Sequence, residues 1–410
     1  METTPLHDAL VLDKLNWQSY SFGLYESIGV MADKWDAFVQ GRDIFLSTPY
    51  LSALEAATPD RMSYYYVLVE DENSVQGVLY FQLIHFNAGA SLNYNRNGSS
   101  SDSGKLRKAL RDFLADRIDF YTLVCGNSAV TGPHGFIFYE NIDQETQLNI
   151  VDCCLSWIKN FAISQGFDVQ LLFIKDFYSP IFTHSDRCTT FPQYNEFQAQ
   201  PGMIMPLRAS WDSFEDYMSD LHSKYRVRVR RARKKCAHIE RRLLSEGDIR
   251  ARQNQLYTFY RTIADKAAFN LSVLHSNYFS VLKEKLKDKF HVYGYFEEDK
   301  LIAFYSIIIN NGSIEAHFLG YEESVNKDKQ IYLNMLLDII EFCIVNKCSK
   351  ILFARTALEI KSSVGAEAHN MYFYLQHSKG LHNKLLPLIF NLLEPKEDWV
   401  ARTPFRESLR

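Results

Sequence analysis

The sequence contains one order of patterns twice, and an internal repeat of this kind constrains a fold more than any single motif does. Residues 67–84 and 292–309 each consist of an apolar stretch, an acidic turn and a second apolar stretch, which predicts two strands joined by a turn. Another strand, an amphipathic helix and a closing strand are then expected at 121–126, 147–165 and 169–174 and again at 314–321, 330–347 and 351–354. We therefore predict an α/β fold of two tandem units, each a mixed sheet between helices.

The length and the distribution of charge also indicate two domains. A chain of 410 residues is long enough for two domains of ordinary size. Residues 1–200 contain 13 Lys and Arg and 24 Asp and Glu, a net charge of −11, whereas residues 201–410 contain the other 32 and 25, a net charge of +7. We predict an accessory domain over 1–200 and a catalytic domain over 201–410 that meets an anion. The proline-containing stretch 190–206 is expected to be a linker or a domain-opening strand.

The sequence shows no signal for export or for crossing a membrane. Residues 1–20 have neither the basic region nor the apolar region of a signal peptide, and the apolar run 385–393 is about half the length of roughly 20 residues that a spanning helix needs. We expect a cytoplasmic protein. The segment 372–393 mixes aromatic, basic and aliphatic residues, so it is either a core or domain-interface segment or a surface that rests on the anionic inner face of the membrane.

A strongly basic helix is predicted over 221–236. Its apolar side chains recur at helical spacing and form one seam, at Leu221, Tyr225, Val229, Ala232 and Cys236. Its basic side chains form two rows, Lys224, Arg228, Arg231 and Lys235 in one and Arg226, Arg230 and Arg233 in the other. Because no acidic residue interrupts them, this surface is either simply solvated or binds an anion. Arg226 and Arg230 are our candidates for contacting substrate phosphate, RNA or an anionic lipid surface.

The predicted strand 314–321 contains the first candidates for catalysis. Strand alternation places Ile314, Ala316, Phe318 and Gly320 on one face and Glu315, His317, Leu319 and Tyr321 on the other. One face then has a carboxylate, an imidazole and a phenol. Either His317 is a hydrogen-bonded core residue, or it takes a proton from an attacking amine while Tyr321 returns one to a leaving group, with Glu315 as a further catalytic candidate.

The stretch after the last predicted strand contains the second set of candidates. Thr356 and Glu359 have the spacing of a capping box, and Gly365 is placed to end a short helix. Capping would give Glu359 a structural role in place of substrate binding. It does not explain Arg355 or Lys361, which lie at the sheet edge where α/β proteins usually bind ligands. We expect this pair to bind a carboxylate or phosphate or to stabilise an oxyanion, and Lys361 is also a catalytic candidate.

These pieces together resemble the GNAT superfamily of N-acetyltransferases, and within it the Fem-type branch with two such domains in tandem. The resemblance rests on the basic helix 224–235, the strand pair 292–309, the segment His317–Tyr321 and the end Arg355–Lys361 with Gly365 and Ala366. It implies transfer of an acyl or aminoacyl group to an amine, with no metal and no permanently bound cofactor. It also implies two diverging strands with the activated carbonyl between them. By position these strands are 301–310 and 314–321, with His317 as the base.

The resemblance leaves the donor open. Thioester-using members of the superfamily usually have a glycine-rich turn after this strand, where helix N-terminal amides bind a pyrophosphate. The corresponding stretch 322–331 has no glycine, and Lys327 and Lys329 are the candidates that supply positive charge instead. Acyl-coenzyme A, an acyl carrier protein and aminoacyl-tRNA, which is the donor in the peptidoglycan-bridge enzymes of the Fem branch, all stay open as donors.

Three functions are compatible with the sequence. The one that we favour is an N-acyltransferase that moves an acyl group from a thioester to an amine of an amphiphilic cell-envelope or lipid acceptor. The second is a Fem-type aminoacyltransferase that adds an amino acid from aminoacyl-tRNA to a peptidoglycan precursor. The third is a non-catalytic module that binds RNA or another anion through the basic helix. DNA is not an expected partner.

Overall fold

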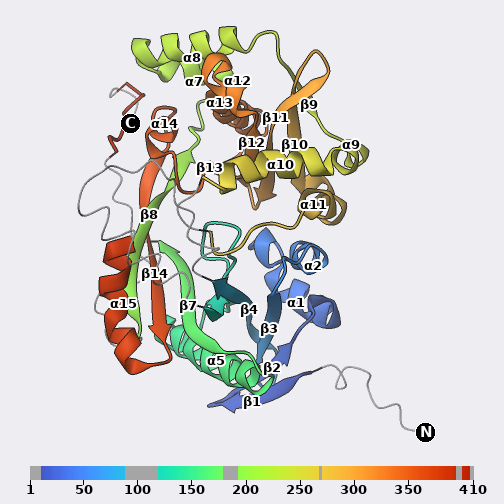
Figure 1. The fold of residues 1–410 in the computed structure, drawn as a ribbon, viewed down its shortest axis with the longest axis vertical. Coiled ribbons are helices and arrows are strands. Elements are labelled where there is room, and N and C mark those ends of the chain that lie inside the picture. Colours follow the sequence, from blue (N-terminus) through green and yellow to red (C-terminus); the bar gives the residue numbers. More distant parts are fainter. Residues whose placement is uncertain (1–10, 88–118, 179–192, 267–269, 394–398, 407–410) are drawn as a thin grey trace. The chain divides into compact units, whose positions relative to one another are not determined.

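The computed structural model describes residues 11–87, 119–178, 193–266, 270–393 and 399–406 (Figure 1). The chain forms two compact units, of which unit 1 comprises Met1–Ala199, Ala267–His275 and Met371–Pro395 and unit 2 comprises Gln200–Lys266, Ser276–Asn370 and Lys396–Arg410. The chain first changes unit next to the predicted boundary at residue 200. Residues 371–395, which we assigned to the C-terminal domain, lie in unit 1 instead, because the strand that contains Met371 pairs there.

Unit 1 is a mixed sheet with helices. Its strand order is β1-β2-β3-β4-β5-β7-β14, with β6 paired to β4, and β5 and β7 are a parallel pair. The strands are β1 (Asp13–Trp17), β2 (Tyr20–Tyr25), β3 (Met62–Glu70), β4 (Val75–Asn87), β5 (Asp119–Cys125), β6 (Phe136–Phe138), β7 (Val169–Tyr178) and β14 (Glu367–His377). The helices are α1 (Ala32–Val39), α2 (Thr48–Ala56), α5 (Gln144–Ser164) and α15 (Gly380–Leu393).

Helix α5 packs on the sheet of unit 1. Asp143 caps it by accepting a hydrogen bond from the backbone N–H of Thr146. Leu148, Val151 and Leu155 recur at helical spacing on its buried face and join one core cluster with the inward side chains of the strands. Burial of these side chains holds α5 against the face of the sheet, and α5 connects the paired parallel strands β5 and β7.

Unit 2 has the strand order β8-β13-β12-β11-β10-β9, in which β12 and β13 are the parallel pair. The strands are β8 (Asn195–Pro206), which begins in unit 1, β9 (Glu240–Leu243), β10 (Phe290–Glu297), β11 (Lys300–Asn310), β12 (Ser313–Tyr321) and β13 (Lys350–Leu352). The helices are α7 (Phe214–Asp220), α8 (Ser223–Lys235), α9 (Glu246–Ala251), α10 (Gln253–Ala264), α11 (Tyr278–Leu286), α12 (Glu323–Lys329), α13 (Ile331–Val345) and α14 (Leu358–Ser362). The stretch predicted as a linker or domain-opening strand is therefore a strand from Asn195 on, and 190–192 lie outside the described residues.

The two units share the element order that the repeat predicts. β3, β4, β5, α5 and β7 correspond to β10, β11, β12, α13 and β13. In both units the helix connects two parallel strands, as such crossovers usually do. The predicted α/β fold of two tandem units with mixed sheets is confirmed. Among the described residues, no helix combines the length and the apolar character that crossing a bilayer requires.

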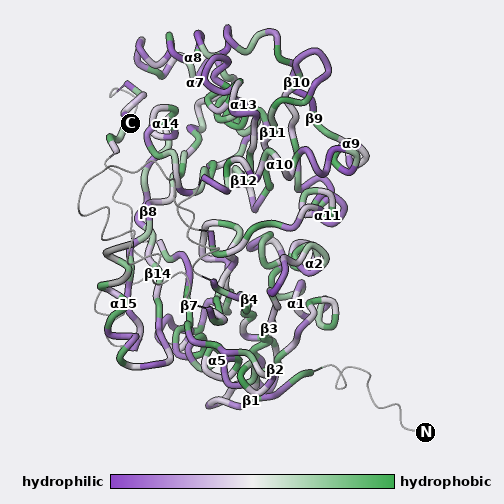
Figure 2. The backbone as a smooth tube through the Cα atoms, in the orientation of Figure 1, coloured by the Kyte–Doolittle hydropathy of each residue, from purple (hydrophilic) through white to green (hydrophobic). Residues whose placement is uncertain are grey.

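The core of unit 2 lies between the sheet, α13 and α8. Helix α13 is apolar along most of its length, whereas α8 is mostly hydrophilic (Figure 2). The seam predicted on α8 is confirmed, because all five of its side chains are buried in one cluster with α13, namely Leu221, Tyr225, Val229, Ala232 and Cys236. Most of the basic residues of α8 are therefore turned away from the core.

Candidate active site

The parallel strands β12 and β13 diverge after a short paired stretch. Their last paired residues are Glu315 and Leu352. Beyond this point β12 continues beside β11, whereas Phe353, the first residue after β13, donates its backbone N–H to Met203 of β8 at 2.8 Å. The C-terminal part of β12 thus loses its ladder with β13, and the edge of β12 that faced β13 is no longer paired with it.

The diverging pair differs from the one that we predicted. We expected 301–310 and 314–321 to separate, but these are β11 and β12, which pair in antiparallel register from Ala303 opposite Tyr321 to Asn310 opposite Ser313. That prediction is wrong. Consecutive antiparallel strands joined by a tight turn stay paired with each other, whereas β13 returns after a whole helix and shares its other edge with β8.

A β-bulge in β12 sets the environment of His317. The register with β11 shifts around Ser306, so this one residue faces two residues of β12. The Oγ atom of Ser306 accepts a hydrogen bond from the backbone N–H of Phe318 at 3.1 Å and lies 3.2 Å from Nδ1 of His317. The hydroxyl of Tyr278 lies 3.0 Å from Nε2, and its ring stacks on the imidazole. Burial lowers the pKa of His317 to about 3, so the imidazole is neutral. A neutral ring with a hydrogen-bonding neighbour at each nitrogen matches the first of our two interpretations, in which His317 is a hydrogen-bonded core residue.

The bulge also changes which residues share a face. Leu319 and Tyr321 pack against the same core cluster as Ala316, whereas Phe318 and His317 both contact Tyr278 on the other side. The predicted common face of His317 and Tyr321 is therefore wrong, because one inserted residue inverts the alternation of all that follow. These two side chains do not form an acid–base pair. Glu315 is buried in the paired part of β12.

The turn between β13 and α14 has a strained backbone. Ala354, Thr356 and Ala357 have φ values of 56°, 71° and 49°, a region that residues other than glycine seldom adopt. The helix begins one residue later than we expected, with Ala357 as its N-cap and no side-chain cap, so the predicted capping box of Thr356 and Glu359 does not form. Gly365 follows the helix with a φ of 113°, as its predicted role requires. Several strained residues in one turn are typical of ligand sites.

Lys361 lies in α14, directly after this turn. It is 4% exposed, and its Nζ donates a hydrogen bond to the backbone carbonyl of Arg355 at 2.7 Å. Burial lowers the pKa of Lys361 to about 7, because the ammonium ion loses its hydration. A large fraction of the amine is therefore uncharged near neutral pH and able to accept a proton. Arg355 itself is half-buried.

Contacts from two other segments hold α14 in place. Arg228 of α8 donates a hydrogen bond to the hydroxyl of Ser363 at 2.9 Å, so the basic helix adjoins the end of α14. Glu359 accepts a hydrogen bond from Nε of Arg402 at 3.0 Å. This ion pair occupies the carboxylate that we had considered for capping or for substrate binding.

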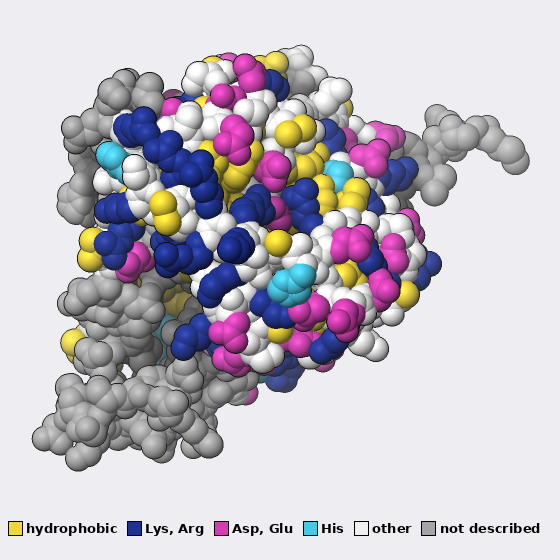
Figure 3. All heavy atoms as spheres, turned by 90° about the horizontal axis from the view of Figure 1, so that it is seen from above, with side chains coloured by type: hydrophobic (Ala, Val, Ile, Leu, Met, Phe, Trp, Pro, Cys, Tyr) yellow, Lys and Arg dark blue, Asp and Glu magenta, His cyan; other side chains and the backbone are white. Residues whose placement is uncertain are grey.

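The exposed side of α8 is a concentrated positive surface. Within the part of the chain that the structure describes, Arg233 is the one basic residue of α8 in an ion pair. The other seven form none with a described residue, namely Lys224, Arg226, Arg228, Arg230, Arg231, Lys234 and Lys235. Lys and Arg side chains gather on the face of the molecule seen in Figure 3, at the end where α8 lies. Because these side chains of α8 form none of the described ion pairs, they repel one another, and a polyanion would relieve that repulsion.

Arg233, which we assigned to the same surface, is neutralised. It donates hydrogen bonds to Asp338, to Glu341 at 3.2 Å and to Asn334 at 3.4 Å, and Asp338 also accepts one from Tyr295. This buried network joins α8 to α13, and our sequence analysis missed it. The signal was present, since Asn334, Asp338 and Glu341 recur at i, i+4 and i+7 in an otherwise apolar helix.

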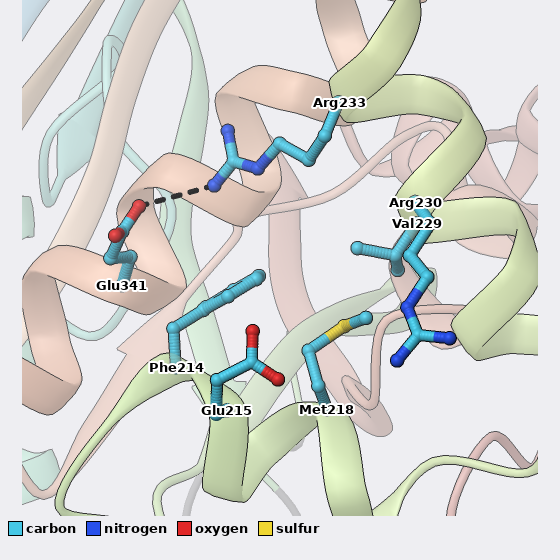
Figure 4. Close-up of a pocket in the computed structure, with 7 residues that line it drawn as sticks. All are labelled: Phe214, Glu215, Met218, Val229, Arg230, Arg233 and Glu341. Atoms are coloured by element: carbon cyan, nitrogen blue, oxygen red, sulfur yellow. Dashed lines mark hydrogen bonds and ion pairs between the residues drawn. The ribbon is translucent and has the colours of Figure 1, made fainter.

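A cavity of about 300 Å³ lies between α7, α8 and α13 (Figure 4). Phe214, Met218 and Val229 supply its apolar walls, and the guanidinium of Arg233 lies 5.2 Å from the centre of the Phe214 ring. Arg230, one of the predicted substrate-binding residues, also lines it. Glu215 and Glu341 line it as well, so Arg230 lies beside a hollow whose walls are partly apolar and partly acidic.

Helix α12 occupies the stretch in which we looked for a pyrophosphate-binding turn. Lys329 pairs with Glu297, whereas Lys327 is exposed. The side-chain oxygen of Asn326 accepts a hydrogen bond from the backbone N–H of Tyr332, in the first turn of α13, at 3.0 Å. One of the amides that would hold a phosphate at this helix end is thus already bound by the chain itself.

Comparisons with known proteins show what the chain is similar to. Residues 182–351 match the FemAB-like family model, described as peptidoglycan biosynthesis/recognition. No curated protein matches the chain. Among solved structures, FemX is 10% identical over 88% of this chain and 97% of its own, with a TM-score of 0.49.

Two further solved structures have similar coverage. A tandem GNAT protein from the clavulanic acid biosynthesis pathway is 10% identical over 88% of this chain and 99% of its own, with a TM-score of 0.47. L-PGS from Bacillus licheniformis is 10% identical over 84% of this chain and 96% of its own, with a TM-score of 0.45. The matched family segment contains α8, β12 and the start of β13. Over residues 182–351 the chain is therefore similar to the FemAB-like family of peptidoglycan biosynthesis/recognition.

Proposed function

We propose that unit 2 transfers an aminoacyl group from tRNA to the amine of an amphiphilic cell-envelope acceptor. The observation that carries this proposal is the divergence of β12 from β13, with a strained turn and a buried lysine, Lys361, following β13 in the chain. The basic helix α8 adjoins the end of α14, the helix that follows this turn, through the hydrogen bond from Arg228 to Ser363. A freed strand edge, a proton acceptor and an anion-binding surface thus occur together in one unit.

In the proposed reaction the carbonyl of the donor ester lies beside the edge of β12 that β13 leaves. Backbone N–H groups on that edge polarise the carbonyl oxygen and stabilise the tetrahedral oxyanion. The acceptor nitrogen attacks the carbonyl carbon and passes its proton to the neutral amine of Lys361. The new C–N bond forms, the C–O bond to the ribose breaks, and the proton leaves with the ribose hydroxyl.

Two observations favour a nucleic-acid donor over coenzyme A. The seven basic residues of α8 that form no ion pair with a described residue suit a run of phosphates. At the helix end where a pyrophosphate would bind, Asn326 already occupies the amide of Tyr332. A thioester on an acidic carrier protein is the second candidate, because α8 would attract its charge and no pyrophosphate site is required.

The donor is tested by presenting the full-length protein with aminoacyl-tRNA, acyl carrier protein thioester or acyl-coenzyme A. An amphiphilic amine is the acceptor, and amide formation is followed by mass spectrometry. We expect amide from aminoacyl-tRNA. Product from acyl-coenzyme A would overturn the choice of donor, and product from none of the three would overturn the proposed activity. Binding of tRNA without turnover would favour the non-catalytic alternative.

The role of Lys361 is tested by Lys361→Met. If the amine is the base, kcat should fall by about two to four decades. The matched control is Lys347→Met, which removes a lysine of unit 2 that is 62% exposed, and this variant should keep its rate. An unchanged rate in folded Lys361→Met protein would remove this residue from the mechanism.

The role of α8 is tested with Arg226→Gln and Arg231→Gln. Affinity for tRNA should fall, and the dependence of log affinity on log salt should flatten by about one for each phosphate that the variant no longer neutralises. Arg250→Gln is the control, because Arg250 is an exposed arginine of α9 that pairs with Glu246. Equal binding by all of these variants would exclude α8 as the donor-binding surface.

A further inference from the structure

Helix α15 of unit 1 has an apolar row that faces outward. Leu381, Leu385 and Leu388 are 71%, 41% and 60% exposed. Their spacing of four and three residues places them along one side of the helix. Single exposed leucines are ordinary on protein surfaces, but three in one helical row form a continuous apolar strip.

The opposite side of α15 is fixed against the sheet of unit 1. Leu386 and Phe390 pack on a cluster that contains Phe197 and Phe373, and the rings of Phe197 and Phe390 lie 4.5 Å apart. At the start of the helix the side chain of Asn383 accepts a hydrogen bond from the backbone N–H of His377 at 2.8 Å. The outward direction of the leucine row is therefore set by packing that does not involve the row itself.

The charges around the row select the partner. Lys384 lies beside the row, Lys379 and His382 flank its first residue, and all three are exposed. Residues 380–393 contain no acid. A second copy of the helix would bring the same cations together without a compensating carboxylate, so self-pairing is opposed by charge. An apolar surface covered with anionic groups satisfies both the leucines and the cations.

We propose that the outward face of α15 docks unit 1 onto an anionic lipid bilayer, with the helix lying in the plane of the interface. Its 14 residues span about 21 Å, and the leucine row would enter the boundary between headgroups and acyl chains. Docking of this kind would bring the protein to amphiphilic acceptors. It does not depend on the proposed transfer reaction and is measured without a donor.

The test is sedimentation of full-length protein with vesicles of phosphatidylglycerol or of phosphatidylcholine. Wild type should bind phosphatidylglycerol vesicles, and added salt should weaken this binding. The triple variant Leu381→Ser, Leu385→Ser and Leu388→Ser should bind at least about tenfold more weakly, and Lys384→Gln should lose affinity only for the anionic vesicles. The control variant Leu243→Ser and Val345→Ser changes two side chains of unit 2 that are 53% and 69% exposed and should bind as wild type does.

Three results would overturn the proposal. Wild type that does not sediment with phosphatidylglycerol vesicles at low salt has no such surface. A triple variant that binds as wild type does, while Arg226→Gln and Arg231→Gln lose binding, would assign the membrane contact to α8. A dimer of wild type that the triple variant abolishes, with no vesicle binding, would identify the row as a self-association surface. Circular dichroism and the melting temperature of the triple variant establish that α15 still folds.

Discussion

Replacing Lys361 by methionine should change the pH dependence of stability in a defined direction. The pKa of Lys361 is lowered from 10.5 to about 7 by burial, so between these values the unfolded chain binds more protons than the folded chain does. The contribution of Lys361 to the free energy of unfolding of the wild type therefore rises with pH between these two values. Methionine has a similar length and no charge, so the variant lacks this contribution.

The size of the effect follows from the two pKa values. At about 1.4 kcal/mol for each pH unit, keeping a charged Lys361 buried below pH 7 costs roughly 5 kcal/mol. The variant should therefore gain most over the wild type near pH 6. That gain should shrink by roughly 2 kcal/mol between pH 7 and pH 9 and be nearly lost above pH 10.5. Loss of the hydrogen bond to the carbonyl of Arg355 is common to all pH values and does not affect this trend.

The assay is urea unfolding of both proteins at several pH values, followed by circular dichroism. Because every other titrating group is shared, the difference between the two proteins isolates Lys361. The same difference for Lys347→Met should stay flat. A flat difference for Lys361→Met between pH 6 and pH 10, or one that grows as pH rises, would refute the idea that this amine is desolvated in the folded chain.

Three further predictions concern unit 2. Gly320→Ala should lower the free energy of unfolding by about 1–3 kcal/mol, since a Cβ there would lie 2.3 Å from the backbone of Phe259; a melting temperature equal to that of the wild type would contradict the close approach. Asp338→Ala should lower the free energy of unfolding by about 1–3 kcal/mol, because it leaves the buried hydroxyl of Tyr295 unpaired whereas Arg233 keeps Glu341 and Asn334; urea unfolding measures this change, and a neutral result would mean that the network is dispensable. His317→Ala should mainly lower the free energy of unfolding, because the imidazole is held by Tyr278 and Ser306. A loss of about two decades in the rate of amide formation at an unchanged free energy of unfolding would restore the role of His317 as base.

The fold could be predicted from the sequence because its signals are periodic. The apolar seam of α8 recurs at helical spacing, and the strand–turn–strand patterns of the two halves repeat. The sequence pattern alone therefore shows which side of each element is apolar and faces the core. The arrangement of the site could not be predicted in the same way. The bulge opposite Ser306 adds one residue to β12, and neither of the two residues at the bulge, His317 and Phe318, is a glycine or proline that would indicate it. The extra residue moves Tyr321 to the other face of the strand.

Long-range pairing accounts for the other differences. The divergence of β12 from β13 depends on β8, which lies more than a hundred residues earlier in the chain. The strained turn that begins at Ala354 contains no glycine, so neither its conformation nor the burial of Lys361 has a local signature. Asp338 was detectable in principle, as an acid in an apolar helix, but its partner on α8 depends on how two helices pack.

The pairing of β14 with β7 has a consequence for synthesis on the ribosome. The strand that completes the sheet of unit 1 is almost the last to be translated, so the edge of β7 opposite β5 stays unpaired while some two hundred residues are added. An exposed strand edge invites pairing with a neighbouring nascent chain. A gene split near residue 200 would therefore encode a first half that lacks this closing strand, and co-expression of the two pieces would be the way to supply it.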